Sequence, residues 1–205
     1  MYLPARFNNK NLDEAKKLVN ENPFATVISL KDNSPFVSHL PLVLEQVENQ
    51  IFLYGHLARA NPHSQLLAHQ STYVIFHGAH SYITPIWYEK NDVPTWNYAV
   101  VHMQGQCEMV EDYEGILDCI RKLSEHVEKD NLVKWQFWVP EDLAAPGFLE
   151  RNIVGFKFKV ADIQAKFKLN QNRAKADQHG VIKGLIKKGD DMSLQMAELM
   201  KKNNL

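Results

Sequence analysis

The sequence predicts a mainly β fold with flanking helices, arranged as a small antiparallel barrel with helices at its margins. Apolar, β-rich segments follow one another with only short turns between them. The regular alternation of strand and helix that builds a doubly wound sheet is missing. Amphipathic helical segments accompany these strands. We therefore expect about six or seven strands and about four or five helices.

The first half of the chain predicts one helix followed by several strands. Asn11 with Glu14 three residues later resembles a capping box, and apolar residues then recur at helical spacing until Pro23. Alternating or continuously apolar residues predict the strands, and Asn61-Pro62 predicts a short helix. The expected strands cover residues 24–30, 35–44, 51–54 and 72–76, and the short helix covers residues 61–68.

The second half predicts longer elements. Residues 95–110 are expected to form one long strand or a bent pair, residues 112–129 an amphipathic helix, and residues 153–160 a strand with one buried face. The remaining expectations are an ordered loop at 83–92, a helix start at 140–143, a polar tail at 166–189 and a terminal helix at 190–202. We expect residues 1–205 to form a single domain with a C-terminal helical tail at about residues 186–205.

The composition is that of an ordinary globular protein. In 205 residues, 23 basic and 24 acidic side chains give a formal net charge of -1, so the charge does not favour DNA binding. Cys107 and Cys119 are the only cysteines, which is typical of a reducing compartment. The sequence has no signal-type N-terminus and no apolar run near the roughly 20 residues of a membrane span. We therefore expect a cytoplasmic protein without membrane contact.

The segment from Gly55 to Pro62 is the strongest candidate ligand site. An apolar strand leads into Gly55 and His56, and a loop then carries Arg59. Asn61 is a favoured N-cap, and the free N–H groups of a first helical turn beside a cation attract anions. Arg59 suits phosphate because its planar guanidinium donates two parallel bonds. Two interpretations of the segment follow. It binds a phosphate, and hence a nucleotide-type ligand, or Arg59 is an ordinary exposed arginine beside an N-cap.

Other catalytic signatures are weak. The chain has no glycine-rich dinucleotide motif, no Walker A sequence and no Cys-x-x-Cys pair. It has 9 histidines, but no close His/Cys/carboxylate spacing predicts a metal. Ser38 and His39 are adjacent, yet neighbouring strand residues point to opposite faces, which argues against a nucleophile–base pair. We therefore assign no catalytic residue and expect no metal.

Two further segments carry side chains that are suited to binding. Trp87-Tyr88 and residues 95–98 combine aromatic rings with polar tips. Three interpretations of these residues are equally supported: they stack on a planar ligand, close a dimer interface or pack in an edge strand. Residues 166–173 alternate cations with apolar side chains and end in amide and guanidinium donors. A solvated tail would not need this apolar anchor, so the segment is a second candidate for ligand recognition.

Several blocks together resemble a known family. The matching blocks are residues 23–26, 38–41, 55–62, 81–85, 87–88, 93–98 and 166–173. The blocks Ala58-Arg-Ala-Asn-Pro62 and Pro94-Thr-Trp-Asn-Tyr98 are specific together and weak singly. On these residues the chain is similar to the PaiB family, whose members are called FMN-binding negative transcriptional regulators. The matches run from the first residues to about Leu185.

The resemblance implies a split β-barrel of the pyridoxamine-phosphate-oxidase type, built as a homodimer with FMN at the subunit interface. It implies that the loop from Gly55 to Asn61 binds the phosphate, and that Ser38 and His39 lie near the isoalloxazine or the ribityl chain. The C-terminal motif would reach the site, in one arrangement from the other subunit. One departure is His63, where the family often has an aromatic residue. The residues expected to bind FMN are Ser38, His39, Gly55, His56, Arg59, Asn61, Lys166, Gln171 and Arg173.

The resemblance leaves the output of the protein open. A flavin-dependent sensor or regulator is the first hypothesis, and a flavin-dependent oxidoreductase of the NAD(P)H:flavin reductase type is the second. Haem binding or degradation is a third, because histidines are numerous. Direct DNA binding is a fourth, although the sequence has no helix-turn-helix signature. The sequence also leaves open whether FMN is retained on purification.

Overall fold

The chain divides into two compact units. A computed structural model describes residues 1–90, 92–131, 133, 135–141 and 144–204. The first unit comprises Met1–Glu21, His77–Val101 and Gln164–Leu205. The second comprises Asn22–Phe76 and His102–Ile163. Each unit has its own packed interior.

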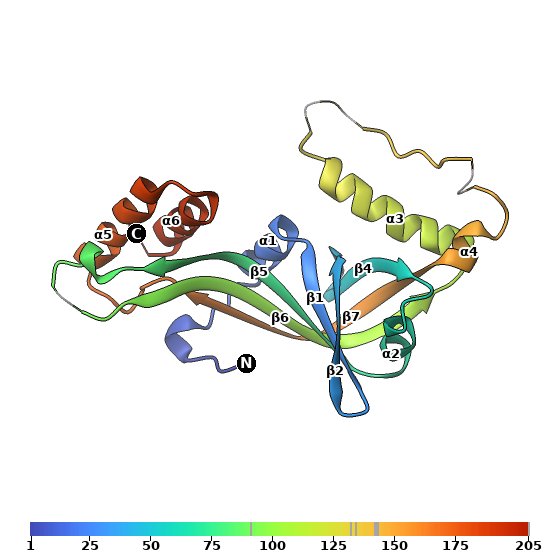
Figure 1. Cartoon of the computed structure of the whole chain (residues 1–205), viewed down its shortest axis with the longest axis horizontal. Coiled ribbons are helices and arrows are strands. Elements are labelled where there is room, and N and C mark those ends of the chain that lie inside the picture. Colours follow the sequence, from blue (N-terminus) through green and yellow to red (C-terminus); the bar gives the residue numbers. More distant parts are fainter. Residues whose placement is uncertain (91, 132, 134, 142–143, 205) are drawn as a thin grey trace. The chain divides into compact units, whose positions relative to one another are not determined.

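The strands of the described residues form a mainly antiparallel, 7-stranded sheet in the order β2-β1-β5-β6-β7-β4-β3 (Figure 1). Strands β5, β6 and β7 each contribute residues to both units. The strands are β1 Phe24–Lys31, β2 Ser34–Pro41, β3 Val43–Val47, β4 Gln50–Ala58, β5 Thr72–Ile83, β6 Thr95–Val110 and β7 Ile153–Lys168. The helices are η1 Ala5–Phe7, α1 Leu12–Glu21, α2 His63–His69, η2 Pro85–Trp87, α3 Tyr113–Glu128, α4 Phe148–Asn152, α5 Lys175–Lys188 and α6 Asp191–Asn204.

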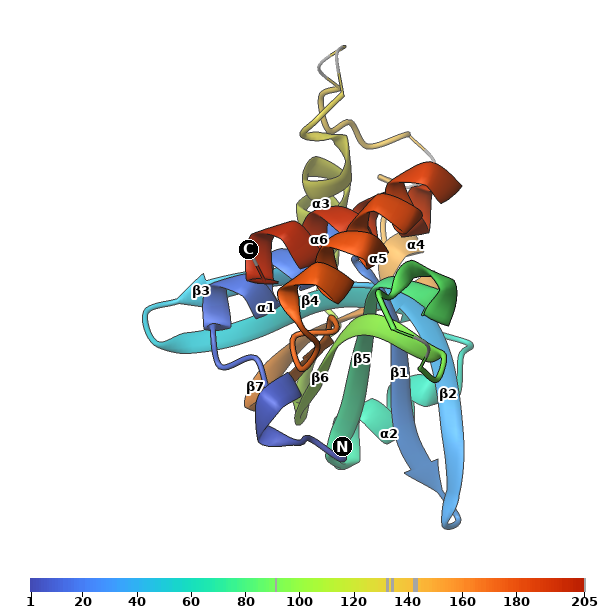
Figure 2. The ribbon, with the colours of Figure 1, turned by 90° about the vertical axis from the view of Figure 1, so that its left-hand side faces the viewer.

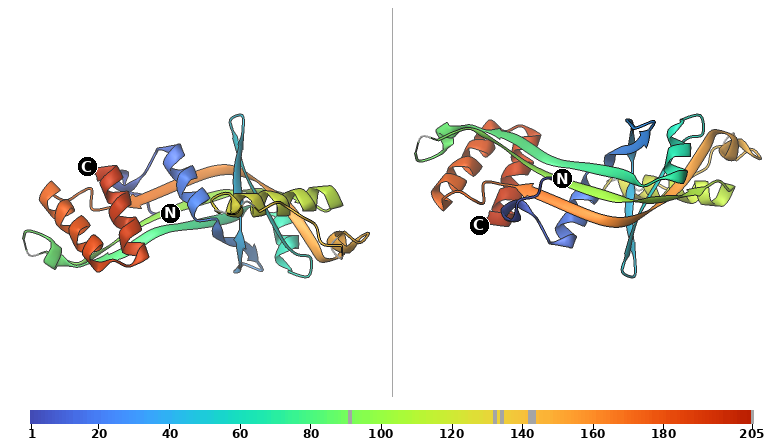
Figure 3. Two further views of the ribbon diagram at one scale, coloured as in Figure 1. Left: turned by 90° about the horizontal axis from the view of Figure 1, so that it is seen from above. Right: turned by 90° about the horizontal axis from the view of Figure 1, so that it is seen from below.

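The second unit is built on two hairpins, β1–β2 and β3–β4. Asp32 and Asn33 turn the first hairpin with positive φ angles of 52° and 61°, a conformation that Asp and Asn tolerate well. Strand β4 pairs with β7, and helix α3 packs against β4. Helix α2 lies beside the β1–β2 hairpin (Figure 3). This arrangement brings the end of β4 and the start of α2 close to strand β2.

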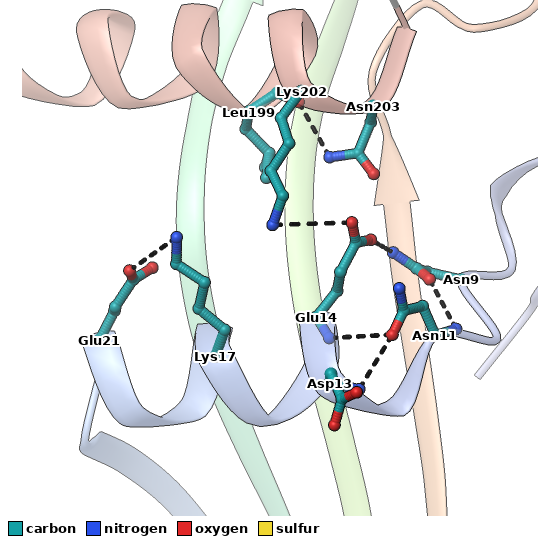
Figure 4. A network of polar contacts seen from close by, with 9 residues as sticks. All are labelled: Asn9, Asn11, Asp13, Glu14, Lys17, Glu21, Leu199, Lys202 and Asn203. Carbon is teal, nitrogen blue, oxygen red and sulfur yellow. Dashed lines mark hydrogen bonds and ion pairs between the residues drawn. The ribbon is translucent and has the colours of Figure 1, made fainter.

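The first unit is built around helices α5 and α6, which pack side by side (Figure 2). Val181, Leu185 and Met196 are 0% exposed, so the two helices share an apolar interior. Helices α1 and α6 are linked by an ion pair of 3.8 Å between Glu14 and Lys202 (Figure 4). The C-terminal helices therefore form part of the packed structure of this unit.

The structure confirms the expected mainly β fold with flanking helices. The elements with strong local signals are found where they were expected: α1, the long strand β6, α3 and α6. The Asn11 side chain caps α1 by accepting from the backbone N–H of Asp13 at 3.0 Å. Glu14 does not complete a capping box, because its carboxylate binds the Asn9 amide and Lys202 instead (Figure 4). In α3, the Asp112 carboxylate accepts from Gly115 N at 2.9 Å.

Several expected strands have the wrong bounds. The strand expected at 35–44 is interrupted between Pro41 and Val43, where the backbone N–H of Leu42 donates to Pro23 instead of continuing the β2 ladder. The expected strands at 51–54, 72–76 and 153–160 are longer in the structure, as β4, β5 and β7. The loop expected at 83–92 contains the end of β5 and η2, and residue 91 lies outside the described residues. Of the expected helix start at 140–143, residues 142–143 also lie outside them.

The polar tail expected at 166–189 is wrong. Strand β7 continues to Lys168, and helix α5 then occupies residues 175–188. Gly180 and Gly184 disfavour a helix in isolation, but they make room for Trp87 in this one. A Cβ at Gly180 would lie 2.1 Å from the Trp87 carbonyl oxygen, and one at Gly184 would lie 2.3 Å from its ring. Tertiary packing therefore outweighs the weak local preference.

Candidate functional site

The turn between β4 and α2 comprises residues 59–62. The Asn61 side chain accepts from the backbone N–H of His63 at 3.0 Å, as expected for a residue that starts a helix. The Asn61 carbonyl accepts from Ser64 N at 3.1 Å and from Ser64 Oγ at 2.9 Å. The turn is therefore held by its own hydrogen bonds. Helix α2 has only 7 residues, so the site depends on the side chains of the turn rather than on a helix terminus.

Arg59 is held in place by three contacts. Its backbone N–H donates to Asn152 O at 2.8 Å, and Nη1 pairs with Glu111 Oε1 at 2.8 Å. Nη2 donates to Ile153 O at 3.4 Å. Arg59 Nε is buried and has no hydrogen-bond partner among the described residues. A buried, unpaired donor on a cation costs free energy, and an anionic ligand would remove that cost.

Ser38, Asn61 and His63 form a hydrogen-bonded cluster beside this turn. Ser38 Oγ lies 2.8 Å from His63 Nδ1, and Asn61 Nδ2 donates to Ser38 Oγ at 3.4 Å. The His63 ring is 0% exposed and packs edge-on against Phe36, with 5.0 Å between the ring centroids. Burial lowers the pKa of His63, so its imidazole is neutral near pH 7. His63 Nε2 has no partner within the described part of the chain.

His39 faces away from this cluster. Its Nδ1 lies 3.3 Å from Thr26 Oγ1, directly across the β1–β2 ladder, and its ring stacks on Phe24 with 6.1 Å between the centroids. The expectation that Ser38 and His39 point to opposite faces is confirmed. The structure therefore brings Ser38 and Asn61 together with His63 and leaves His39 on the other face of β2.

Gly55 and His56 lie within β4, because the strand continues to Ala58. The expectation of a loop that begins at Gly55 is therefore wrong. A Cβ on Gly55 would lie 2.5 Å from Leu42 and 2.8 Å from Phe156, so the glycine is required by packing. His56 points to the opposite face of β4, where its Nδ1 is buried without a partner among the described residues. Burial lowers the pKa of His56.

The three predicted residues of the C-terminal motif lie in the first unit. Lys166 Nζ donates to Tyr2 O at 3.0 Å. Gln171 accepts from Leu169 N at 2.7 Å and donates to Phe167 O at 2.6 Å. Arg173 pairs with Asp92, and its guanidinium lies 4.9 Å from the centroid of the Tyr88 ring. The contacts of Gln171 and Arg173 stabilise the turn that connects β7 to α5, whereas Lys166 lies in β7 itself.

The two aromatic segments differ in their surroundings. Trp87 packs against α5, and Tyr88 is 8% exposed and accepts from Asn170 Nδ2 at 3.3 Å, so this pair stabilises the unit. Trp96 is 48% exposed and stacks on His80, with 6.0 Å between the ring centroids. Stacking on a ligand and closing an interface both stay open for Trp96.

The cysteines and other ionisable groups form no further reactive centre in the described residues. Burial raises the pKa of Cys107 to about 12 and that of Cys119 to about 11, so both thiols stay protonated near pH 7. No group of three or more His, Cys, Asp or Glu residues in the described part is arranged to hold a metal ion. None of the described helices combines the length and the apolar character needed to cross a membrane.

Sequence reasoning missed His63 as a site residue. Its contact with Ser38 joins positions 25 residues apart, which local patterns do not predict. The signal available in the sequence was its departure from the aromatic residue that often follows Pro62 in similar chains. Arg59, Asn61 and Ser38 were predicted as site residues, and the structure places them on or beside one turn.

Comparisons with known proteins show the family and the fold of this chain. The family model described as "Putative FMN-binding domain" matches residues 1–162. The chain is 39% identical to the protease synthase and sporulation protein PAI 2 of Bacillus subtilis (strain 168), over 98% of this chain and 96% of that protein. Two solved structures share the fold at low sequence identity. The flavocytochrome Anf3 of Azotobacter vinelandii has a TM-score of 0.58 at 15% identity, covering 78% of this chain and 69% of that one. An FAD- and haem-binding protein of Mycobacterium smegmatis has a TM-score of 0.59 at 14% identity, covering 78% and 73%.

The fold and the match to the family model define a flavin-binding protein of the split β-barrel class. The chain belongs to the PaiB family of FMN-binding proteins, and FMN is the cofactor of this family. The residues of the β4–α2 turn fit such a group. FMN offers acceptor oxygens on its phosphate and ring, and Arg59 Nε is a buried donor without a partner among the described residues.

Proposed function

We propose that this protein is a flavin-dependent sensor or regulator that holds the phosphate of FMN at the β4–α2 turn. One observation carries the proposal: the Nε of Arg59 is buried and has no partner among the described residues. The chain belongs to an FMN-binding family, and FMN has a phosphate that such a cation binds. Glu111 pairs with Nη1 and orients the guanidinium without occupying Nε. Arg59 therefore supplies the charge and a fixed donor for the phosphate.

Asn61 and Ser38 complete the proposed direct contacts. Asn61 is held by the hydrogen bonds of its own turn, so its position is fixed before a ligand arrives. Ser38 supplies a hydroxyl at a half-buried place beside Asn61. His56 adds a neutral imidazole on β4, since burial lowers its pKa. Gly55 contributes by keeping β4 close to Leu42 and Phe156.

The structure gives less support for direct contact between FMN and the remaining predicted residues. Lys166, Gln171 and Arg173 already have partners in their own unit, so we propose that they act mainly by shaping the turn between β7 and α5. His39 is exposed and would contact FMN only from the other face of β2. The structural support for these four residues is therefore indirect.

We also propose a homodimer. Trp138 and Val133 are 69% and 83% exposed, and Val127 at the end of α3 is 56% exposed. When a second chain covers exposed apolar side chains of this size, apolar surface is removed from water, and this removal favours association. The three side chains belong to one unit, at the end of α3 and in the segment that follows it. A second copy of the chain is the partner we propose for it.

FMN when bound supplies the electron chemistry of such a protein. The protein contributes position and charge. Arg59 binds the phosphate, Glu111 orients the Arg59 guanidinium, and Asn61 orients the turn. His56 and His63 are neutral and add no charge to the site. Flavin chemistry needs no general base from the protein, so the residues of this turn are compatible with both a sensor and an oxidoreductase. Regulation through direct DNA contact would have to act without a basic excess, because the net charge is -1.

An equilibrium titration of the protein with FMN tests the proposal. We expect quenching of flavin fluorescence that saturates at one FMN per chain, together with sedimentation as a dimer. Absence of binding after reconstitution would refute the flavin site. Steady oxidation of NADPH by the FMN-loaded protein would instead favour the oxidoreductase hypothesis, and promoter retardation that FMN does not alter would contradict a flavin-dependent regulator.

A further inference from the structure

Ser38 and His63 form a hydrogen bond, and which of the two donates the hydrogen decides whether the Ser38 hydroxyl can donate to a ligand. Ser38 Oγ and His63 Nδ1 are 2.8 Å apart and join strand β2 to the first residue of α2. His63 is 0% exposed and neutral near pH 7. A neutral imidazole carries a single N–H, so its tautomer decides which partner donates.

Two observations favour a hydrogen on His63 Nδ1. His63 Nε2 is buried without a partner among the described residues, so a hydrogen there would leave an unpaired N–H in the interior. Asn61 Nδ2 already donates to Ser38 Oγ, at 3.4 Å. With Nδ1 protonated, His63 donates to the same oxygen and both of its lone pairs are used. The hydroxyl hydrogen of Ser38 then has no acceptor within this cluster and points away from it.

We infer that His63 is a positioning residue that orients the Ser38 hydroxyl as a hydrogen-bond donor to an acceptor oxygen of bound FMN. This inference rests on the proposed function of the turn. Phosphate and carbonyl oxygens accept hydrogen bonds and cannot donate them, so a hydroxyl whose lone pairs are filled is matched to them. Ser38 thereby adds a second fixed donor beside Arg59.

The inferred tautomer of His63 also excludes Ser38 as a nucleophile that His63 activates. A general base must accept the hydroxyl hydrogen, but Nδ1 in this tautomer already carries one. No carboxylate among the described residues holds the opposite ring nitrogen, as a catalytic triad requires. The pair therefore serves to bind and orient.

Nitrogen NMR spectroscopy of labelled histidine tests the tautomer in the protein without added ligand. At about pH 7, we expect His63 Nδ1 to be protonated and Nε2 unprotonated. A hydrogen on Nε2 would overturn the inference. This measurement does not depend on FMN binding, so it tests the tautomer of His63 separately from the proposed function.

A double-mutant cycle on FMN binding tests the coupling. We expect Ser38→Ala and His63→Phe each to raise the Kd for FMN by about 10-fold, and the double variant to raise it by no more than one of them. His63→Asn places an amide N–H near the position of Nδ1 and is expected to restore binding to within about 3-fold of wild type. His69→Phe, at an exposed histidine of the same helix, is the matched control and should leave the Kd unchanged.

The outcomes of the cycle are distinguishable. Additive losses in the double variant, or a His63→Asn variant that binds as weakly as His63→Phe, would overturn the inference while leaving the flavin site intact. Equal losses in all His63 variants together with lower melting temperatures would assign His63 a purely structural role and also overturn it. Failure of the wild-type protein to bind FMN would refute the proposed function, and the tautomer would still be measured.

Discussion

Arg59 and Arg173 both belong to segments that the sequence predicts to bind FMN, yet their surroundings differ. Arg59 pairs with the exposed Glu111, and its Nε is buried without a partner among the described residues. Arg173 pairs with Asp92 and stacks on Tyr88, and this contact raises the pKa of Arg173 and lowers that of Asp92. Both arginines pair with a carboxylate, but Arg59 also has a buried donor, Nε, that has no partner among the described residues and is suited to an added anion. Similar donor side chains can therefore serve a ligand in one unit and the fold in the other.

The interior of the C-terminal helices gives the largest expected effect. Leu185 is 0% exposed in α5, so Leu185→Ala should lower the free energy of unfolding by about 3 kcal/mol through lost burial and a residual cavity. Its neighbour Ile186 is 44% exposed, and Ile186→Ala should cost far less. Urea unfolding measures both. If both variants lowered the free energy of unfolding by the same small amount, α5 would not be a structural part of its unit. The proposed difference between the C-terminal unit and the β4–α2 region would then be wrong.

The β4–α2 region should make the protein sensitive to acid. In an unfolded chain, histidine has a pKa of about 6.5. Burial lowers the pKa of His56 and His63 in the folded chain. Below about pH 6.5 the unfolded chain therefore binds more protons, and the free energy of unfolding falls as the pH falls. Urea unfolding near neutral pH and in mild acid should show a smaller loss for the His56→Gln/His63→Gln variant than for wild type.

A matched control for this acid sensitivity is His69→Gln, since His69 is exposed on the same helix. This variant should lose as much stability in acid as the wild-type protein. An identical acid response in the double variant would mean that His56 and His63 are not protonated on unfolding, contrary to their burial.

Arg173 gives the smallest expected effect on binding. Arg173→Ala should lower the midpoint of urea unfolding, because Asp92 and Tyr88 lose their partner, but should change the Kd for FMN by less than about 3-fold. Lys183→Ala, an exposed cation on α5, serves as the control for the loss of one positive charge. A rise in Kd of about 10-fold or more in Arg173→Ala alone would place the C-terminal motif in direct contact with the flavin.

Elements with strong local signals could be predicted from the sequence. The starts of α1 and α3 are predicted near Asn11 and Asp112, and in the structure each of these side chains accepts a hydrogen bond from a backbone N–H of its helix. Helix α5 could not be predicted in this way, because Gly180 and Gly184 weaken its local preference. Those glycines become favourable only against Trp87, a residue far away in the sequence.

The candidate site shows the same limit. Arg59 and Asn61 lie in one short segment, so strand, turn and cap signals point to them together. The family resemblance implies a loop that begins at Gly55, whereas in the structure this glycine lies inside β4, where a side chain would collide with Phe156. The contact of Ser38 with His63 arises only when β2 and α2 meet, so no local pattern encodes it.

The central claim is that Arg59 binds the phosphate of FMN, and a comparison of FMN with riboflavin tests it most directly. Riboflavin has the same ring and ribityl chain but no phosphate. Arg59→Ala should weaken FMN binding by about 100-fold, or about 2.7 kcal/mol, and leave riboflavin binding nearly unchanged. Arg121→Ala, an exposed arginine of the same unit that is also paired with a carboxylate, should affect neither ligand. Equal losses for both flavins in Arg59→Ala, or no loss for FMN, would contradict the account.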